Sequence, residues 1–591
     1  MNKHLIIWRV LFLLIAGLSW LTPVSAKPPL LVVPAEVFQP DNTQTPPASR
    51  LRAASESSLT MARRNSRPMS MELGAPNDAE LATIQTENSR YKALQIGIKR
   101  QVPTLPAAAD WVWTPVSGGQ AGQFLIVSDQ ASRLRALLRL PAALPDGVEI
   151  RIYTPDDDQS VHGPFTRDSF QADDNSNGAP YELWTPTVSG TTLGIEIFAP
   201  DGVDTTDINV GVPTISHIVY DLQSGQFKNI STHKLNSCDV SIACAPGAWQ
   251  DTAKAVARYI YTASDGNSYL CSGTLINDQN SATQEPYFIT AAHCVSDTNS
   301  AASMDFFWLY RESSCGADDA VWTQVSGGAE LLVSRVELDT TLVRMNNLPP
   351  SGVTISGWML ETFTDDETAT GIHHALGDMK QFSNGQFNSY TDINLVEGGY
   401  TATQNPEGDF AQVIWSTGIT APGSSGSGLW KTVNAQHFLK GTLVGGSSSC
   451  AAPDSPDEYS RLERFYPFTT AWLGAPPLQS ILDQQNDPQP LTDGIMLARY
   501  MNGVRGNALL SGITTENVDI ATIESRLQDA VNNLDIDENG TTEGNRDGLL
   551  FIRYLLGLRG NSLVADIDLT ASPNNTPAGI TTAIEAVLAG E

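Results

Sequence analysis

The order of hydrophobic and polar positions along this chain indicates short strands through most of its length. Gly147–Tyr153 reads GVEIRIY and Thr192–Phe198 reads TLGIEIF, so apolar residues recur at every second position. This period is typical of a half-buried strand. Asp-Gly and Pro-Asp pairs near such runs indicate turns. The pattern predicts mainly β structure, with further strands at Phe124–Val127 and Leu134–Leu140.

Near the C-terminus the pattern becomes helical and repeats itself. Thr492–Leu509 reads TDGIMLARYMNGVRGNAL, and Arg546–Leu563 reads RDGLLFIRYLLGLRGNSL. Each copy predicts an amphipathic helix that ends at a glycine, Gly503 or Gly557. The chain is therefore expected to end in a small α-helical module, which we place at residues 475–591 because two prolines mark its start.

Composition divides the rest of the chain into four parts. Residues 1–26 combine basic residues, an apolar core and a small-residue cleavage site, as secretory signal peptides do. Residues 27–90 are rich in Pro, Ser, Thr, Asn and Gln, which predicts a disordered segment or linker. Residues 91–234 have strand patterns and no cysteine, which predicts an all-β domain. Residues 235–474 hold all six cysteines and form the next domain.

The charge and the cysteines narrow the class of protein. The 591 residues include 65 acidic and 35 basic ones, a net charge of −30, which argues against binding to nucleic acid. Six clustered cysteines behind a signal peptide indicate three disulfides in an oxidising compartment. After the signal peptide no apolar stretch is long enough to span a bilayer. We therefore expect a secreted, soluble protein.

Two separated motifs carry the candidate chemistry. Tyr287–Cys294 reads YFITAAHC and presents His293 at the end of a strand-like run. Ala421–Trp430 reads APGSSGSGLW and presents Ser425 in a glycine-rich turn, where the backbone can approach a substrate closely. A histidine beside a strand-end cysteine, followed by Gly-x-Ser-Gly-Ser, resembles the chymotrypsin/trypsin superfamily of serine proteases.

The resemblance implies a pair of antiparallel β-barrels and a nucleophilic mechanism. His293 would be the general base, Ser425 the nucleophile, and the amides of Gly423 and Ser425 the oxyanion hole. The third member, a carboxylate, is expected between His293 and Ser425. Asp339 opens DTTLVRM after an apolar-rich stretch and resembles the Asp-x-x-Leu-Leu segment of the family. Its rivals stand mostly in polar, turn-like runs: Asp297, Asp305, Asp318, Asp319 and Asp365.

Two departures from the trypsin pattern lead to a narrower resemblance. Ser424 stands where trypsin-like enzymes have the aspartate of their activation switch, and Ile419 where they have their specificity aspartate. Gly441–Cys450 reads GTLVGGSSSC and Asp457–Leu462 reads DEYSRL, which together resemble the bacterial lysyl endopeptidases. That likeness implies that Asp457 binds the substrate lysine.

The same resemblance supplies the pocket wall, the disulfides and a propeptide. Val444, Gly445 and Gly446 would line the specificity pocket, with Val444 close to where such enzymes can carry a histidine, so the preference for lysine over arginine stays open. The all-β domain would be a propeptide, cleaved after Lys234. The implied disulfides are Cys271–Cys294, Cys238–Cys450 and Cys244–Cys315.

A calcium loop is indicated ahead of the second helical repeat. Side-chain oxygens recur at alternate positions before a turn-forming glycine, and a further acid follows, as in EF-hand loops. The expected ligands are Asp535, Asp537, Asn539, Thr541 and Asp547. The closing acid comes one residue later than usual, and a solvated Asp/Asn loop is the alternative. The two repeats together resemble a dockerin-type module, which implies a protein ligand.

Together these features predict a secreted serine endopeptidase, made as a precursor and decorated with structural Ca²⁺. It would cleave protein or peptide substrates after basic residues, preferably lysine, and would need no catalytic cofactor. Two alternatives remain. One is a trypsin-like protease of arginine or broad specificity. The other is a catalytically silent adhesion or scaffold protein, in which the calcium module is the functional part.

Overall fold

The computed structural model describes most of the chain in two compact units. One unit is Val32–Gly474, and the other includes the chain from Ala475 onward. The described residues are 31–40, 59–64, 67–88, 93–155, 157–172, 180–221, 226–227, 238–280, 284–317, 319, 321–396, 399–474, 488–513, 519–570 and 572–589. The expected signal peptide and Lys234 lie outside them.

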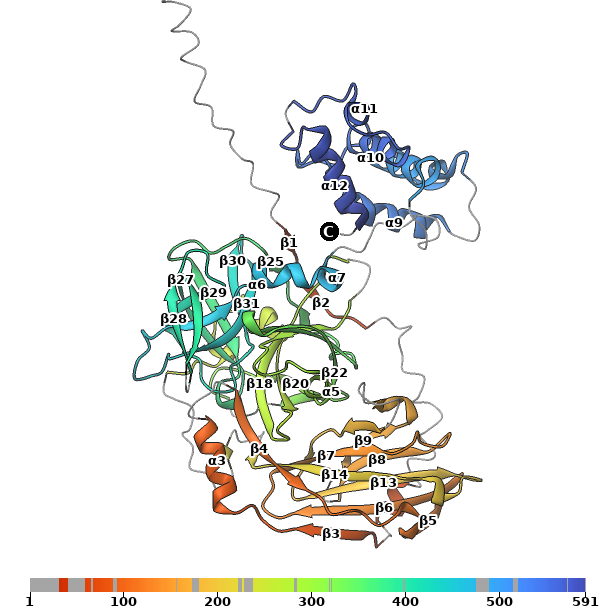
Figure 1. The fold of residues 1–591 in the computed structure, drawn as a ribbon, viewed down its shortest axis with the longest axis vertical. Helices are drawn as coiled ribbons and strands as arrows, with labels where there is room; N and C mark the ends of the chain where they lie inside the picture. Colours follow the sequence, from red (N-terminus) through yellow and green to blue (C-terminus); the bar gives the residue numbers. More distant parts are fainter. Residues whose placement is uncertain are drawn as a thin grey trace, which may run out of the picture. The chain divides into compact units, whose positions relative to one another are not determined.

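The first half of the larger unit is a two-layer β-sandwich, called the N-terminal sandwich below (Figure 1). One layer has the order β3-β6-β13-β8-β9, with β5 paired to β6. The strands of this layer are β3 (Met69–Leu73), β5 (Trp113–Val116), β6 (Gly119–Ser128), β8 (Glu149–Thr154), β9 (Asp157–Phe165) and β13 (Thr192–Pro200). Their alternating apolar residues face inward, so Ile126, Ile150 and Ile195 are fully buried in one cluster.

The second layer has the order β10-β11-β7-β14-β4, with β12 beside β7. The strands of this layer are β4 (Leu94–Gln101), β7 (Arg133–Leu140), β10 (Gln171–Ala172), β11 (Tyr181–Trp184), β12 (Val188–Ser189) and β14 (Gly211–Ile218). Leu138 and Ile215 close the core from this side. A short hairpin, β15 (Tyr220–Asp221) with β16 (Gln226–Phe227), follows.

The prediction of a disordered segment or linker at residues 27–90 is wrong for its described part. β1 (Val32–Val33) pairs with β25, and β2 (Glu36–Val37) pairs with β24. Phe38 is only 2% exposed and lies in the same core cluster as Phe288.

The rest of the segment is ordered by the sandwich. Residues 59–64 are helical and place Arg63 in an ion pair of 2.7 Å with the buried Glu196. β3 extends the first layer, and α3 (Asp78–Asn88) contacts β4. The segment has few apolar residues of its own, and its few anchors are buried by partners distant in the sequence.

The second half of the larger unit holds two barrel-like sheets. The first surrounds an aromatic core that includes Tyr259, Phe288, Phe306 and Trp308. Its elements are α4 (Trp249–Thr252), β17 (Val256–Thr262), β18 (Ser268–Leu275), β19 (Tyr287–Thr290), α5 (Thr298–Ala302), β20 (Asp305–Arg311), β21 (Val321–Val325), β22 (Ala329–Arg335) and β23 (Thr340–Met345). β17 reads VARYIYT and is buried along its whole length, as its β-branched and aromatic residues favour.

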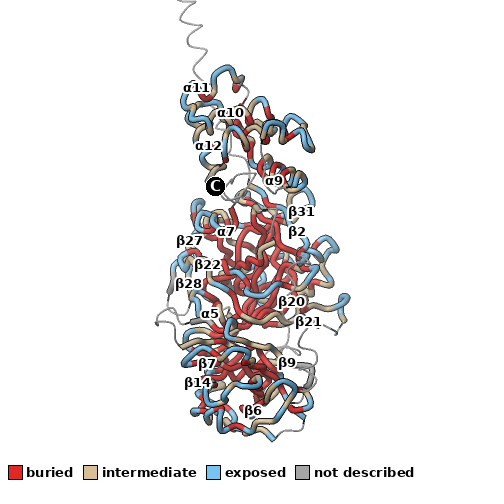
Figure 2. The backbone as a smooth tube through the Cα atoms, turned by 90° about the vertical axis from the view of Figure 1, so that its right-hand side faces the viewer, coloured by how far each residue is buried: buried red, intermediate tan, exposed pale blue. Residues whose placement is uncertain are grey.

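The second sheet closes on itself. Its order β31-β30-β26-β27-β29-β32 is completed by the pairing of β32 with β31. Its elements, with the flanking short ones, are β24 (Thr354–Ile355), β25 (Trp358–Met359), β26 (Thr368–His373), β27 (Gln381–Val396), β28 (Gly399–Gln404), β29 (Phe410–Thr417), β30 (Gly428–Val433), β31 (Gln436–Gly446), β32 (Asp457–Ser460), α6 (Leu462–Phe465) and α7 (Thr470–Leu473). Figure 2 shows the buried cores of both barrels and of the sandwich. The expectation of a mainly β chain is confirmed.

One strand joins the N-terminal sandwich to the first barrel. β4 pairs with β14 of the sandwich and with β18 of the barrel, so that a single 13-stranded sheet crosses the boundary. Leu94, Ile96 and Ile218 from the sandwich share a buried cluster with Ile260 and Leu270 from the barrel. The two parts therefore share a buried cluster at their boundary, in addition to the separate core of each.

Three disulfides fasten the barrels. They join Cys238 to Cys450, Cys244 to Cys315, and Cys271 to Cys294. These are the same pairs that the family resemblance implies.

The C-terminal unit is helical. Its helices are α8 (Ile495–Met501), α9 (Ile520–Asn532), α10 (Asp547–Leu555), α11 (Asn561–Val564) and α12 (Pro577–Ala589). The two sequence repeats are also repeats of structure. After α8 the guanidinium of Arg505 lies 3.5 Å from the centre of the Tyr500 ring, and after α10 that of Arg559 lies 3.4 Å from the centre of the Tyr554 ring. Among the described residues, no helix is long and apolar enough to cross a membrane.

Candidate active site

The two barrels meet at the candidate nucleophile. The amide of Ser272, on β18 of the first barrel, donates to the carbonyl of Ser425 at 2.9 Å. Ser425 stands in the turn between β29 and β30 of the second barrel. His293 follows β19 of the first barrel, and the disulfide of its neighbour Cys294 to Cys271 ties that loop to β18.

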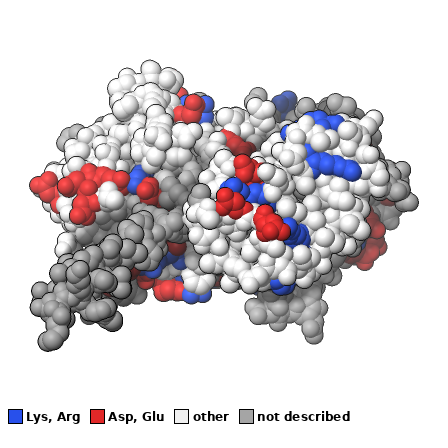
Figure 3. Space-filling model, turned by 90° about the horizontal axis from the view of Figure 1, so that it is seen from above, with Lys and Arg blue, Asp and Glu red and all other residues white. Residues whose placement is uncertain are grey.

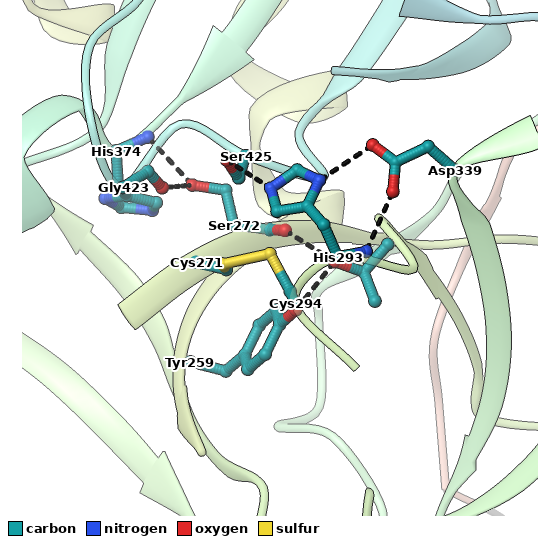
Figure 4. Close-up of a disulfide and its surroundings, with 10 residues drawn as sticks. Tyr259, Cys271, Ser272, His293, Cys294, Asp339, His374, Gly423 and Ser425 are labelled. Carbon is teal, nitrogen blue, oxygen red and sulfur yellow. Dashed lines mark hydrogen bonds and ion pairs between the residues drawn. A yellow bond between two sulfur atoms is a disulfide. The ribbon is translucent and has the colours of Figure 1, made fainter. Parts of the chain in front are cut away.

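Three side chains form one hydrogen-bonded chain at this junction (Figure 4). Nδ1 of His293 lies 2.7 Å from Oδ2 of Asp339, and Nε2 lies 2.8 Å from Oγ of Ser425. The backbone amide of His293 also donates to Oδ1 of Asp339 at 2.8 Å. The carboxylate therefore fixes both the orientation of the imidazole and the loop that carries it.

Asp339 owes its position to a tight turn. It ends the 3₁₀ turn Val336–Leu338 in the left-handed region, with φ 47° and ψ 43°, and β23 begins at the next residue. Left-handed backbone is uncommon for a residue other than glycine, and such strain often accompanies functional positions. Among its rivals, Asp297 caps α5 and Asp305 accepts hydrogen bonds from Thr187.

The imidazole of His293 is poised to take a proton. Burial lowers the pKa of His293, but the charge and the hydrogen bond of Asp339 together raise it by more. The pKa of His293 therefore lies above its ordinary value. The side chain of His293 keeps 31% exposure, so it can reach a bound substrate. A histidine that is oriented by a carboxylate and lies within hydrogen-bond distance of the nucleophile suits general acid–base catalysis.

The turn around Ser425 leaves two amides for a substrate oxygen. Gly423 has φ 96°, and a Cβ there would lie 2.8 Å from the carbonyl oxygen of His374, so only glycine fits. Among the described residues, no hydrogen-bond acceptor lies on the amide of Gly423 or Ser425. Both amides can therefore stabilise an oxyanion.

His373 supports this turn, although no sequence motif identified it in advance. Its Nδ1 lies 2.9 Å from Oγ of Ser424, and its Nε2 lies 2.9 Å from Oγ of Ser383. Ser424 is thus held by a buried histidine at the position where trypsin-like enzymes carry an aspartate. Because His373 is about 50 residues from the nucleophile, no local motif links the two.

Asp457 lies fully buried at the start of β32. Its Oδ2 accepts hydrogen bonds of 2.7 Å from Nε1 of Trp415, Oγ1 of Thr420 and Oγ of Ser448. These three donors are neutral groups, and they orient the carboxyl group of Asp457.

The expected pocket residues surround Asp457. Gly446 pairs with it across β31 and β32, and a Cβ on Gly446 would lie 1.8 Å from its Oδ1. Gly445 is buried, Val444 is half-buried, and Ile419 is 2% exposed beside Thr420. The amide of Gly426, next to Ser425, donates to Leu443 of β31 at 2.9 Å, which connects this wall to the nucleophile turn.

A separate cluster of carboxylates lies in the C-terminal unit. Ligand oxygens of Asp535, Asp537 and Asp547 lie within 4.8 Å of one another. Burial, followed by the charge of Asp537, raises the pKa of Asp547 to about 6, although backbone amides oppose the shift. Asn539 and Thr541 lie in the same loop, where Oδ1 of Asn539 accepts from the amide of Thr541 at 2.8 Å. Arg546 forms an ion pair of 3.2 Å with Asp537.

The two barrels, the activated serine and the paired amides define a class. A serine whose proton can pass to an oriented imidazole, beside preformed oxyanion donors, can attack a peptide carbonyl. The chain is a serine endopeptidase.

Comparison with known proteins gives the family. The lysyl endopeptidase C-terminal domain matches residues 233–460, and the lysyl endopeptidase N-terminal domain matches residues 72–219. A lysyl endopeptidase of Pseudomonas aeruginosa is 30% identical over 396 residues, which cover 63% of this chain and 80% of that protein. The chain belongs to the lysyl endopeptidase family.

Solved structures with related folds are more distant. The MamO protease domain of Magnetospirillum magneticum is 12% identical with a TM-score of 0.25, covering 37% of this chain and 97% of its own. The Rv3671c protease of M. tuberculosis in its active form is 11% identical with a TM-score of 0.26, covering 42% and 96%. At these TM-scores they add nothing to the assignment.

Proposed function

We propose that this endopeptidase cleaves peptide bonds after basic residues, preferably lysine, through an acyl-enzyme on Ser425. His293 takes the proton of Ser425 as its oxygen attacks the carbonyl, and later gives it to the leaving amine. Asp339 orients the imidazole and stabilises its charged form. The amides of Gly423 and Ser425 hold the negative oxygen of the tetrahedral intermediate.

The preference for a basic residue is carried by the buried carboxylate of Asp457. Removing a carboxylate from water is costly unless hydrogen bonds and a positive charge compensate it. The neutral donors around Asp457 supply the hydrogen bonds. The ammonium of a bound lysine would supply the charge. The Pseudomonas aeruginosa relative is a lysyl endopeptidase, which supports lysine as the preferred residue.

Replacing the carboxylate of Asp457 with a neutral amide tests this specificity. Asp457→Asn should weaken transition-state binding of lysyl substrates by about 2–5 kcal/mol, the scale for removing one partner of a buried charge pair. Glu458→Gln is the matched control, because it removes a buried carboxylate from the next residue of β32, on the opposite face of the strand. The measurement is kcat/KM on paired lysyl, arginyl and neutral peptides. Equal loss in both variants, or none in Asp457→Asn, would place the specificity elsewhere.

The precursor and its export are part of the same proposal. Residues 1–26 would direct secretion, and cleavage after Lys234 would release the N-terminal sandwich as a propeptide. Lys234 is the basic residue that precedes the first barrel cysteine most closely, so the enzyme could process itself.

We also propose that the C-terminal unit holds one structural Ca²⁺. The converging oxygens of Asp535, Asp537 and Asp547 suit a hard cation, and Ca²⁺ takes six to eight oxygen ligands. Asn539 and Thr541 could complete the set with side-chain and carbonyl oxygens. The two matching repeats support a dockerin-type module that binds another protein. The hydrogen bonds that link Asp339, His293 and Ser425 favour an active enzyme over a catalytically silent scaffold.

A further inference from the structure

The N-terminal sandwich reaches the loop behind the oxyanion hole through one side chain. Tyr220 follows β14 and is fully buried. Its hydroxyl donates to the carbonyl of Leu376 at 2.6 Å. Leu376 belongs to the second barrel, in the loop between β26 and β27. Burial strongly raises the pKa of Tyr220, so the phenol keeps the proton that it donates.

The loop that accepts the hydrogen bond of Tyr220, Ala375–Gly377, has a strained backbone. Leu376 has φ 54° and ψ 19°, in the left-handed region. A branched side chain there costs free energy that surrounding contacts must offset. Two such contacts lie on the carbonyl groups of the loop: Tyr220 binds that of Leu376, and the guanidinium of Arg258 binds that of Gly377.

The strained loop in turn orients the oxyanion hole. The amide of Leu376 donates to the carbonyl of Pro422 at 2.6 Å. In a planar trans peptide the C=O and the following N–H point in opposite directions. Since the oxygen of Pro422 is held toward Leu376, the amide of Gly423 points away from that loop. The carbonyl of Gly423 is also fixed, because it accepts from Oγ of Ser272 at 2.8 Å (Figure 4).

We propose that Tyr220 is a positioning residue that assembles the oxyanion hole in the precursor. It stabilises the left-handed Leu376, whose amide holds the Pro422–Gly423 peptide in the orientation that catalysis needs. The precursor is then able to carry out its own first cleavage. The hydrogen bonds of Asp339, His293 and Ser425 and the oxyanion donors are all formed while the sandwich is attached. This inference rests on the proposed function of Ser425 and Gly423.

The hydroxyl of Tyr220 can be removed with little change in packing. Tyr220→Phe keeps the ring in its buried cluster and removes the hydroxyl that donates to Leu376. Ser216→Ala is the matched control: its buried hydroxyl also crosses from the sandwich to the barrel, to Oγ of Ser268 at 2.6 Å. Both changes are made in full-length chain carrying Lys234→Ala, with the intact mass verified, so that the sandwich stays attached.

The readout is kcat and KM for a small lysyl ester, with the rate of labelling by a fluorophosphonate. Loss of one oxyanion donor lowers kcat about 10²–10³-fold, so an indirect effect of about tenfold is expected for Tyr220→Phe. KM should stay within about twofold, since the ester still binds and only transition-state stabilisation is lost. Labelling should slow in parallel, and Ser216→Ala should change neither.

Three results would overturn the inference. An unchanged kcat in Tyr220→Phe would show that the loop keeps its conformation without this hydrogen bond, and an equal loss in Ser216→Ala would show a general effect of the interface. A Lys234→Ala chain that retains Tyr220 but neither hydrolyses the ester nor reacts with the fluorophosphonate would show that the oxyanion hole is not assembled in the precursor. The proposed function itself would be refuted only if the chain with Lys234 intact were also inert toward both reagents after cleavage at that residue.

Discussion

His293 lies between two partners that act on it in opposite ways. Asp339 stabilises the protonated, positively charged form of the imidazole, whereas only the neutral form can accept the proton of Ser425. Since Asp339 holds the pKa of His293 above its ordinary value, activity should fall as pH decreases through that raised pKa. The acid limb of kcat/KM therefore reports on this one pair.

Asp339→Asn tests the pair. The amide carries no charge, so the pKa of His293 should drop and the acid limb should move to lower pH. The maximal kcat should fall about 10⁴-fold, because the imidazole loses its correct tautomer. Asp297→Asn is the control, since Asp297 only caps α5 and asparagine caps as well. An acid limb that stays in place in Asp339→Asn would contradict this account.

Residues with a local signal could be identified from the sequence, and those without one could not. His293 and Ser425 stand in motifs, and Asp339 stands out through the strand that follows it. His373 and Tyr220 act through partners about 50 and 156 residues away. No pattern along the chain reports such a contact.

At the scale of elements, the segment before the N-terminal sandwich shows how tertiary partners override composition. Its strands β1 and β2 are two residues each and have no stability of their own. They are held by β25 and β24 and by the burial of Phe38 in the core of the first barrel.

Phe38→Ala should lower the free energy of unfolding of the full-length chain by about 3–5 kcal/mol, the cost of truncating a buried phenylalanine. Val37→Ala is the control, because Val37 is 53% exposed and should cost about 0.5 kcal/mol or less. Urea unfolding followed by tryptophan fluorescence measures both. Equal costs would mean that this segment is not packed in solution as described.

The acidic loop before α10 makes a second prediction at this scale. Calorimetry on the full-length chain should detect one Ca²⁺ at millimolar or lower concentration, and binding should raise the stability of the C-terminal unit by mass action. Asp537→Asn should abolish the uptake. Asp568→Asn removes a nearby exposed carboxylate and should leave it unchanged. Heat of binding that is the same in both variants would assign the ion to another place.

The hydrophobic pattern predicted the positions of strands correctly, whereas amino-acid composition did not predict which segments of the chain are ordered. The runs expected at Phe124–Val127 and Leu134–Leu140 lie within β6 and β7. A strand pattern is a local property of the sequence, so it can be detected even though β6 and β7 pair with strands about 70 residues away. Within residues 27–90, strands β1 and β2 are too short to show such a pattern, and they are ordered by partners distant in the sequence.

At the scale of the whole chain, the sandwich and the first barrel are continuous through β4. Each of the two parts also has a core cluster of its own, and a third, smaller cluster spans the boundary between them. Figure 3 shows one dense group of Asp and Glu side chains, and elsewhere smaller acidic groups, several of them beside Lys and Arg side chains. This distribution agrees with the net charge of −30, which argues against binding to nucleic acid.

The most direct test of the central claim is to locate a covalent adduct. The full-length chain is treated with a fluorophosphonate, digested, and analysed by mass spectrometry. We expect one adduct, on Ser425, with no labelling in Ser425→Ala and a rate reduced by several powers of ten in His293→Ala. No adduct on the unmodified chain, or an adduct on another serine, would contradict it.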